Sequence, residues 1–105
     1  MRRVRIHAAA VEEAAEAAAW YEKERPGLGT DFQQAIEAAL DLLEEDIVPL
    51  VSAKGIVGAR GLKRLLLRRF PYSVIVRERA EEIVVIAFAH TARRPGYWRG
   101  RLKSS

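Results

Sequence analysis

The stretch Leu62–Trp98 constrains the fold of this chain more than any other part of the sequence. Two runs rich in Val, Ile and aromatic residues, Tyr72–Arg77 and Ile83–His90, are separated by a short polar segment. This pattern is typical of an antiparallel β-hairpin. The preceding run, Leu62–Phe70, predicts a third strand, which Pro71 separates from the hairpin because proline has no N–H to donate to a ladder. We therefore expect the upstream half of the chain to cover a sheet.

That upstream half predicts one short strand and then a helix. Charged and apolar residues alternate over Arg3–His7, which indicates a strand. From Ala8 onwards apolar residues recur at three- and four-residue spacing, which indicates a helix with acidic residues on its other faces. The helix is expected to end near Arg25, because Pro26 disfavours helical geometry in the residue before it.

A second helix is expected after the Pro-Gly-Leu-Gly turn. Thr30 and Gln33 have the spacing of a capping box, and a slightly earlier start at Leu28 is also compatible with the sequence. Pro49 ends this helix, and the glycine-containing segment Leu50–Gly61 predicts a flexible loop. The apolar stripe of the helix consists of Phe32, Ile36, Leu40, Leu43 and Ile47.

The predicted element order is β-α-α-β-β-β. It describes an α+β fold in which a helical hairpin packs on a small, mainly antiparallel sheet. A chain of 105 residues is expected to form a single domain, spanning residues 1–105.

Composition limits the environment in which the chain works. There is no cysteine, which excludes disulfides and thiolate metal sites and favours the cytoplasm. No apolar run approaches the roughly 20 residues of a membrane span, and no signal peptide is expected. Since no metal-ligand spacing is present either, we expect no metal ion, no cofactor and no membrane partner.

The charged residues divide unevenly along the chain. Residues 1–53 carry 5 Lys or Arg against 11 Asp or Glu, whereas residues 54–105 carry 13 against 3. A basic half of this size suits a polyanionic partner such as nucleic acid, the ribosome or an acidic protein segment. The alternative is an arginine-rich but otherwise ordinary soluble surface.

The first candidate site lies on the predicted strand Leu62–Phe70. Strand alternation puts Arg64 and Arg68 on one face and Arg69 on the other. Because the helical hairpin covers one face, one set of guanidinium groups is expected to project from the open face or the edge, where it can bind phosphates bidentately. The same charges also protect an edge strand from pairing with other sheets, so both interpretations stay open.

The second candidate site follows the last predicted strand. His90 ends that strand, and Arg93, Arg94, Tyr97 and Trp98 follow within eight residues. A histidine beside a tyrosine and arginines can act as acid or base on a phosphodiester, with the arginines stabilising the developing charge. In the alternative, which the lone histidine favours, His90 hydrogen-bonds the tail in place while Tyr97 and Trp98 anchor it to the sheet.

Short motifs in both halves of the chain resemble the RelE/ParE toxin superfamily, and the resemblance spans about Val4 to Trp98. The motifs are Trp20-Tyr21-Glu22, Pro26-Gly27-Leu28-Gly29, Phe32, Arg69-Phe70-Pro71-Tyr72-Ser73-Val74-Ile75, Ala89-His90, Arg93/Arg94-Pro95 and Tyr97-Trp98. The resemblance implies a β-α-α-β-β-β toxin of a type II toxin–antitoxin (plasmid stabilisation) system, wrapped and neutralised by a cognate antitoxin.

The superfamily implies two kinds of target. RelE-like members bind the ribosome and cut mRNA, whereas ParE-like members are not enzymes and inhibit DNA gyrase. This chain has Ser73 where RelE-like nucleases resemble one another in holding Arg, and Arg64 and Leu66 where they have two lysines, although Tyr97 matches their C-terminal tyrosine. The resemblance therefore favours the ParE-like kind. A third hypothesis is a toxin-like fold that serves only as a binding module.

The resemblance also implies residues for each hypothesis. The residues of a ribosome-dependent mRNA endonuclease would be Arg64, Arg68, His90, Arg93 and Tyr97. The candidates for contact with the target or the antitoxin are Arg64, Arg68, Arg69, Arg93, Arg94 and Trp98. We expect an antitoxin helix or strand to lie on the basic sheet or along the helical hairpin, with acidic residues facing these arginines.

Overall fold

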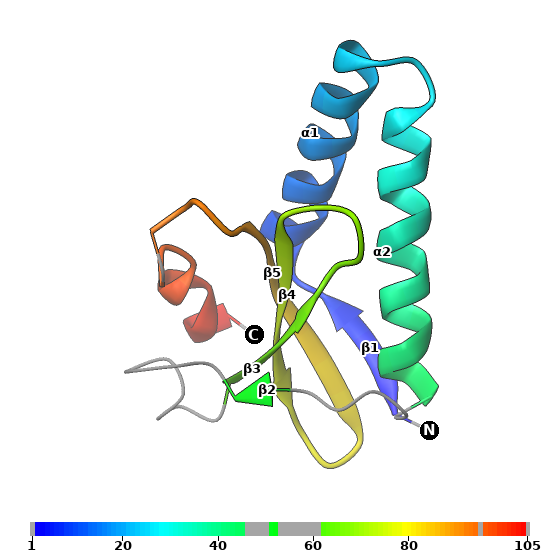
Figure 1. Ribbon diagram of the computed structural model, residues 1–105. Coiled ribbons are helices and arrows are strands. Elements are labelled where there is room, and N and C mark those ends of the chain that lie inside the picture. The colour runs from blue at the N-terminus through cyan, green and yellow to red at the C-terminus, as the bar shows by residue number, and fades with distance from the viewer. Residues whose placement is uncertain (1, 46–50, 53–61, 95, 105) are drawn as a thin grey trace.

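The structure is a computed structural model that describes residues 2–45, 51–52, 62–94 and 96–104 (Figure 1). It has an α+β architecture, as the sequence predicted. The elements are β1 (Arg3–Ile6), α1 (Ala8–Glu24), α2 (Leu28–Glu45), β2 (Val51–Ser52), β3 (Leu62–Leu66), β4 (Tyr72–Glu78), β5 (Glu82–His90) and the 3₁₀ helix η2 (Arg99–Ser104). None of the helices in these ranges is both long and apolar enough to cross a bilayer.

The strands form one sheet in the order β1-β5-β4-β3-β2, in which β1 runs parallel to β5 and all other neighbours are antiparallel. The predicted β4–β5 hairpin is confirmed. It contains a bulge, because Ile75 faces Ala87 while Val76 faces Val85, which leaves Ile86 as the extra residue. Beyond the bulge the alternation of β5 is reversed, so that His90 lies opposite Tyr72 on the side of the helices.

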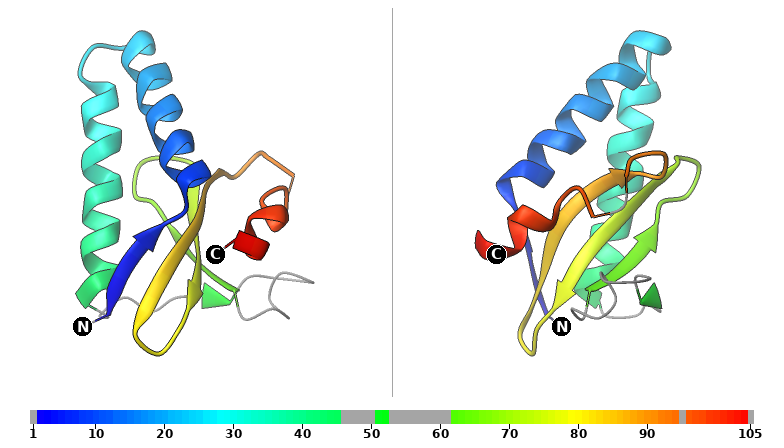
Figure 2. Two further views of the ribbon diagram at one scale, coloured as in Figure 1. Left: turned by 180° about the vertical axis from the view of Figure 1, so that it is seen from behind. Right: turned by 90° about the vertical axis from the view of Figure 1, so that its left-hand side faces the viewer.

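The sheet is covered on both faces (Figure 2). The helices pack on one face, where Phe32 and Ile36 of α2 meet Val74, Val76 and Val85 of the strands. The C-terminal segment, residues 96–104, packs on the other face. Both the front and the back view place it across the sheet from α2. Its contacts with the sheet come from Trp98 and Leu102, which join a second apolar cluster with Leu62, Ile75, Val84, Ile86 and Ala87.

The end of the first strand and the start of the second helix differ from the main predictions. The first strand ends at Ile6 because His7 is the N-cap of α1, where its Nδ1 accepts a hydrogen bond from the Ala9 N–H at 3.1 Å. α2 begins at Leu28, the alternative start that the sequence allowed, so the capping box at Thr30 is wrong. Glu22 caps α2 instead: its carboxylate accepts hydrogen bonds from the N–H groups of Gly27 and Gly29, at 2.9 and 3.0 Å.

The strand boundaries also need correction. β3 ends at Leu66 rather than Phe70, and Arg69 beyond it has a positive φ of 73°, which a strand does not allow. Val51 and Ser52, predicted as loop, form the short edge strand β2. The rest of the predicted Leu50–Gly61 loop lies outside the described residues, as do Ile47 and Pro49.

The two helices approach each other closely at Gly29. A Cβ atom at this position would lie 2.5 Å from the Ala18 carbonyl oxygen and 2.9 Å from the Glu22 carboxylate. Gly29→Ala is therefore expected to lower the free energy of unfolding by about 1–3 kcal/mol, since the helices must separate to admit the methyl group. Urea denaturation measures this change, and Gly100→Ala, with no atom within 4 Å of the added Cβ, is the control. Equal midpoints for the two variants would contradict the prediction.

Candidate functional site

The structure distributes the predicted basic residues over three places rather than one cationic surface. Arg64 lies opposite Ile75 and therefore on the face that the C-terminal segment covers. Arg68 and Arg69 line a groove beside α2, and Arg93 lies near α1, 3.7 Å from Glu13. The prediction that Arg64 and Arg68 share a strand face is wrong, because β3 ends two residues before Arg68 and its alternation stops there.

The carboxylate of Glu13 in α1 lies at the centre of a cluster with Phe88, Tyr97 and Arg101, which we call the C-terminal cluster. The Tyr97 hydroxyl donates a hydrogen bond to its Oε2. The Arg101 guanidinium donates two more, at 2.8 Å to Oε1 and 3.0 Å to Oε2. The Phe88 N–H of β5 donates a further one to Oε1 at 3.1 Å. A single carboxylate thus joins α1, β5 and the C-terminal segment.

The end of β1 explains why this carboxylate can reach the sheet. β1 pairs with β5 only from Glu82 to Val85, and the His7 N–H donates to the Val85 carbonyl at 2.9 Å. From there the chain turns into α1, so no residue of β1 lies beside Phe88. The Glu13 carboxylate supplies the acceptor that a longer β1 would have supplied to the Phe88 N–H.

The cluster raises the pKa of two of its members and so keeps them protonated. Burial, and then the hydrogen bond and charge of Glu13, raise the pKa of Tyr97 far above its usual value. The hydrogen bond to Glu13 raises the pKa of Arg101. The Arg93 guanidinium stacks on the Tyr97 ring, 3.6 Å from its centre. Tyr97 is therefore held as a neutral hydrogen-bond donor between two cations and one anion.

We expect this arrangement to lose stability in alkali. Because the pKa of Tyr97 is raised by folding, the unfolded chain releases the proton first, and the stabilisation present below pH 10 is lost as the pH rises. The slope of this loss approaches ~1.4 kcal/mol per pH unit only when the unfolded tyrosine is fully ionised, and solvent screening of the partly exposed ring limits the total loss between pH 9 and pH 11 to about 1 kcal/mol. Urea midpoints at pH 9 and pH 11 should fall more for the wild type than for Tyr97→Phe. Parallel falls would exclude this assignment.

His90 makes a hydrogen bond of the kind that the structural alternative predicted. Its Nδ1 accepts a hydrogen bond from the Ala92 N–H at 2.9 Å, which fixes the turn into the C-terminal segment. Its ring meets the Tyr72 ring edge to face, with centres 5.1 Å apart. His90 and Arg93 line one pocket of about 230 Å³, whose remaining lining includes Glu13, Glu16 and Trp20. Two carboxylates in so small a pocket oppose the binding of a phosphate.

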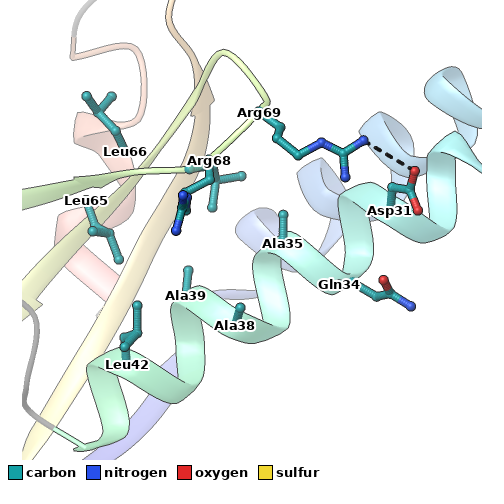
Figure 3. Close-up of a pocket in the computed structure, with 11 residues that line it drawn as sticks. Asp31, Gln34, Ala35, Ala38, Ala39, Leu42, Leu65, Leu66, Arg68 and Arg69 are labelled. Carbon is teal, nitrogen blue, oxygen red and sulfur yellow. Dashed lines mark ion pairs between the residues drawn. The ribbon is translucent and has the colours of Figure 1, made fainter.

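Arg68 and Arg69 belong to a larger groove of about 560 Å³ between α2 and the end of β3 (Figure 3). Most of its lining is apolar, and Figure 3 shows the α2 side chains facing the groove from below. At its upper end Arg69 forms an ion pair with Asp31 at 3.5 Å. The apolar lining consists of Ala35, Ala38, Ala39, Leu42, Leu65, Leu66 and Leu67.

Arg94 and Trp98, the last two residues predicted to contact the target or the antitoxin, differ in exposure. Arg94 is exposed and stays a candidate for contact with a partner. Trp98 is only 4% exposed, so the expectation that it contacts a partner is corrected. Its indole is buried in the second apolar cluster, where it anchors the C-terminal segment as the alternative interpretation predicted.

Part of the opposite charge on the two halves of the sequence is neutralised by ion pairs within the fold. Acidic residues of the first half pair with arginines of the second half, Glu13 with Arg93 and Arg101 and Asp31 with Arg69. Sequence reasoning missed Glu13, because it is one of several glutamates in an alanine-rich helix and nothing in the spacing distinguishes it. It also missed Arg101, whose position depends on the turn that precedes η2.

Comparison with known proteins identifies the fold. No protein-family model and no curated protein sequence matches this chain. Among solved structures, a chain of the chromosomal ParDE TA system from P. aeruginosa superimposes with a TM-score of 0.72 and 17% sequence identity. The match covers 86% of this chain and 96% of that chain. The chain therefore has the fold of the ParE/RelE-type toxins, as the sequence motifs implied.

Proposed function

We propose that this protein is the toxin of a type II toxin–antitoxin system of the plasmid-stabilisation kind. It acts in the cytoplasm as a ParE-like toxin, binds a protein target such as DNA gyrase and is neutralised by a cognate antitoxin. The shared fold with a chain of a ParDE system supports the class.

The bond between Tyr97 and Glu13 supports a binding function over RNA cleavage. A tyrosine that assists attack on a phosphodiester must reach the substrate, and the hydroxyl of Tyr97 donates to a carboxylate within its own chain. Arg64 lies on the face covered by the C-terminal segment, whereas His90 lies on the side of the helices. The side chains that a RelE-like mRNA endonuclease would use therefore point to different sides of the sheet.

Expression in cells that lack an antitoxin tests this function. The wild type is expected to arrest growth and to inhibit supercoiling by purified gyrase. Tyr97→Phe and His90→Ala are expected to retain both effects if circular dichroism shows them folded. Loss of toxicity by about 100-fold or more in folded Tyr97→Phe, with cleavage of mRNA on ribosomes by the wild type, would establish the endonuclease instead. Harmless expression of the wild type would favour the binding module.

The groove beside α2 is the best-supported surface for the antitoxin. It combines an apolar floor, formed by Ala35, Ala38 and Leu42, with two exposed arginines: Arg68 points into the groove towards α2, and Arg69 lies at the end beside Asp31 (Figure 3). These features suit a partner segment with a row of apolar side chains and an acidic end. The surface lies along the helical hairpin, which is one of the two places expected from the sequence.

A further inference from the structure

The donors that meet at Glu13 form a complete anion receptor. They are a bidentate arginine (Arg101), a tyrosine hydroxyl (Tyr97), a backbone amide (Phe88) and the second arginine, Arg93, at 3.7 Å. Both oxygens of the Glu13 carboxylate accept at least two of these contacts. The side chains of Glu13 and Arg101 are only 13% and 18% exposed, so water does little to screen the interaction.

This donor set consists of groups that proteins use to bind anions. Two guanidinium groups, one hydroxyl and one backbone N–H converge on the Glu13 carboxylate. Planar bidentate arginine, a hydroxyl and an N–H are also the groups that bind phosphates and carboxylates as ligands. Glu16, which is exposed on the same helix, lines the adjacent pocket together with Glu13 and Arg93.

We propose that Tyr97, Arg101, Arg93 and the Phe88 amide form an oxyanion site whose occupant in this protein is its own Glu13. The tethered carboxylate competes at high effective concentration, so the site is closed to free anions and to RNA phosphates in the wild type. Removal of the carboxylate leaves a site for a small oxyanion of the carboxylate or phosphate class. The proposal does not depend on the cellular target of the protein.

The consequence for the fold is that the occupant of this site controls how the C-terminal segment attaches to α1. Arg101 belongs to η2 and Tyr97 to the turn before it. Both side chains are expected to detach from α1 if the anion is lost. Trp98 lies between these two residues and is buried against the sheet, which makes its fluorescence a reporter of attachment. Trp20→Phe removes the other indole, which is 57% exposed.

The test compares Glu13→Ala with Glu13→Gln in the full chain that carries Trp20→Phe. Sodium formate and inorganic phosphate are titrated separately, with sodium chloride at matched ionic strength as reference, and thermal midpoint and Trp98 emission are recorded. Glu13→Ala is expected to melt below the parent and to recover saturably with formate or phosphate. An anion bound with a Kd of about 1 mM and supplied at 0.1 M raises the ratio of folded to unfolded protein about 100-fold.

Three controls make the outcome decisive. Glu13→Gln keeps the site sterically filled, so it should not respond to either anion. Glu16→Ala, on the same helix, should melt like the parent and also not respond. Adding Arg101→Ala to Glu13→Ala should abolish the rescue. Rescue by neither anion beyond the chloride reference, or equal rescue with and without Arg101, would overturn the proposal. If Glu13→Ala is unfolded without anion, refolding by formate is the supporting result and failure to refold is the opposing one.

Discussion

Trp98→Ala is expected to lower the free energy of unfolding by about 3–5 kcal/mol. The indole is almost completely buried and packs against Ile75, Val84 and Ile86 on the face of the sheet opposite the helices. Its loss leaves a cavity and also weakens the attachment of η2, which has few other apolar anchors besides Leu102 among the described residues. A domain of this size is stable by about 5–15 kcal/mol, so this is a large part of the total.

The chain provides a matched control for this substitution. Trp20→Ala removes the same side chain from an exposed position on α1 and is expected to cost less than about 1 kcal/mol. Guanidinium denaturation followed by far-UV circular dichroism, which does not depend on either indole, gives both values. Similar losses for the two variants would mean that the C-terminal segment contributes little to the fold and that its packing on the sheet is marginal.

The elements that could be predicted from the sequence are those whose signal is local. The β4–β5 hairpin is visible as two β-rich runs around a polar turn, and α1 ends where Pro26 requires it. The capping box at Thr30 placed the start of α2 too late, although Leu28 had stayed open as an alternative, because the cap comes from Glu22 on the preceding helix. A capping box is a local pattern, whereas a carboxylate reaching across a turn is a tertiary contact.

The candidate site could be predicted less well than the fold, since it depends on which residues meet across long sequence separations. The positions of Tyr97 and Arg93 in the sequence suggested chemistry, but their partner is Glu13, more than 75 residues away. The bulge at Ile86 could not be predicted from the sequence either, although it determines on which face of the sheet His90 lies. The unequal charge of the two halves predicted a polyanionic partner such as nucleic acid, the ribosome or an acidic protein segment, and some of the anions that pair with these arginines are the chain's own Glu13 and Asp31.

Ala38→Trp is expected to weaken binding of the cognate antitoxin by at least about 30-fold, the equivalent of a hot spot of ~2 kcal/mol. Ala38 is exposed on α2 and lines the groove, so an indole at this position would fill the volume proposed for the antitoxin segment. The fold should remain intact, because the substitution costs only about 0.5–0.7 kcal/mol of helix propensity at an exposed site. Calorimetric titration with a purified candidate antitoxin measures the loss.

Ala15→Trp is the matched control, since Ala15 is an exposed alanine within α1 that does not line the groove. It carries the same cost in helix propensity and should bind the antitoxin as the wild type does. Arg68→Glu, which reverses one charge at the end of the groove, should weaken binding in low salt more than in high salt, because an exposed charge acts mainly through screened attraction. If Ala38→Trp binds normally while Arg68→Glu does not, the antitoxin contacts the arginines from the sheet rather than from the groove. If both bind normally, the groove is not the antitoxin site, and the basic residues near the C-terminal segment, Arg93 and Arg94, become the surface to test.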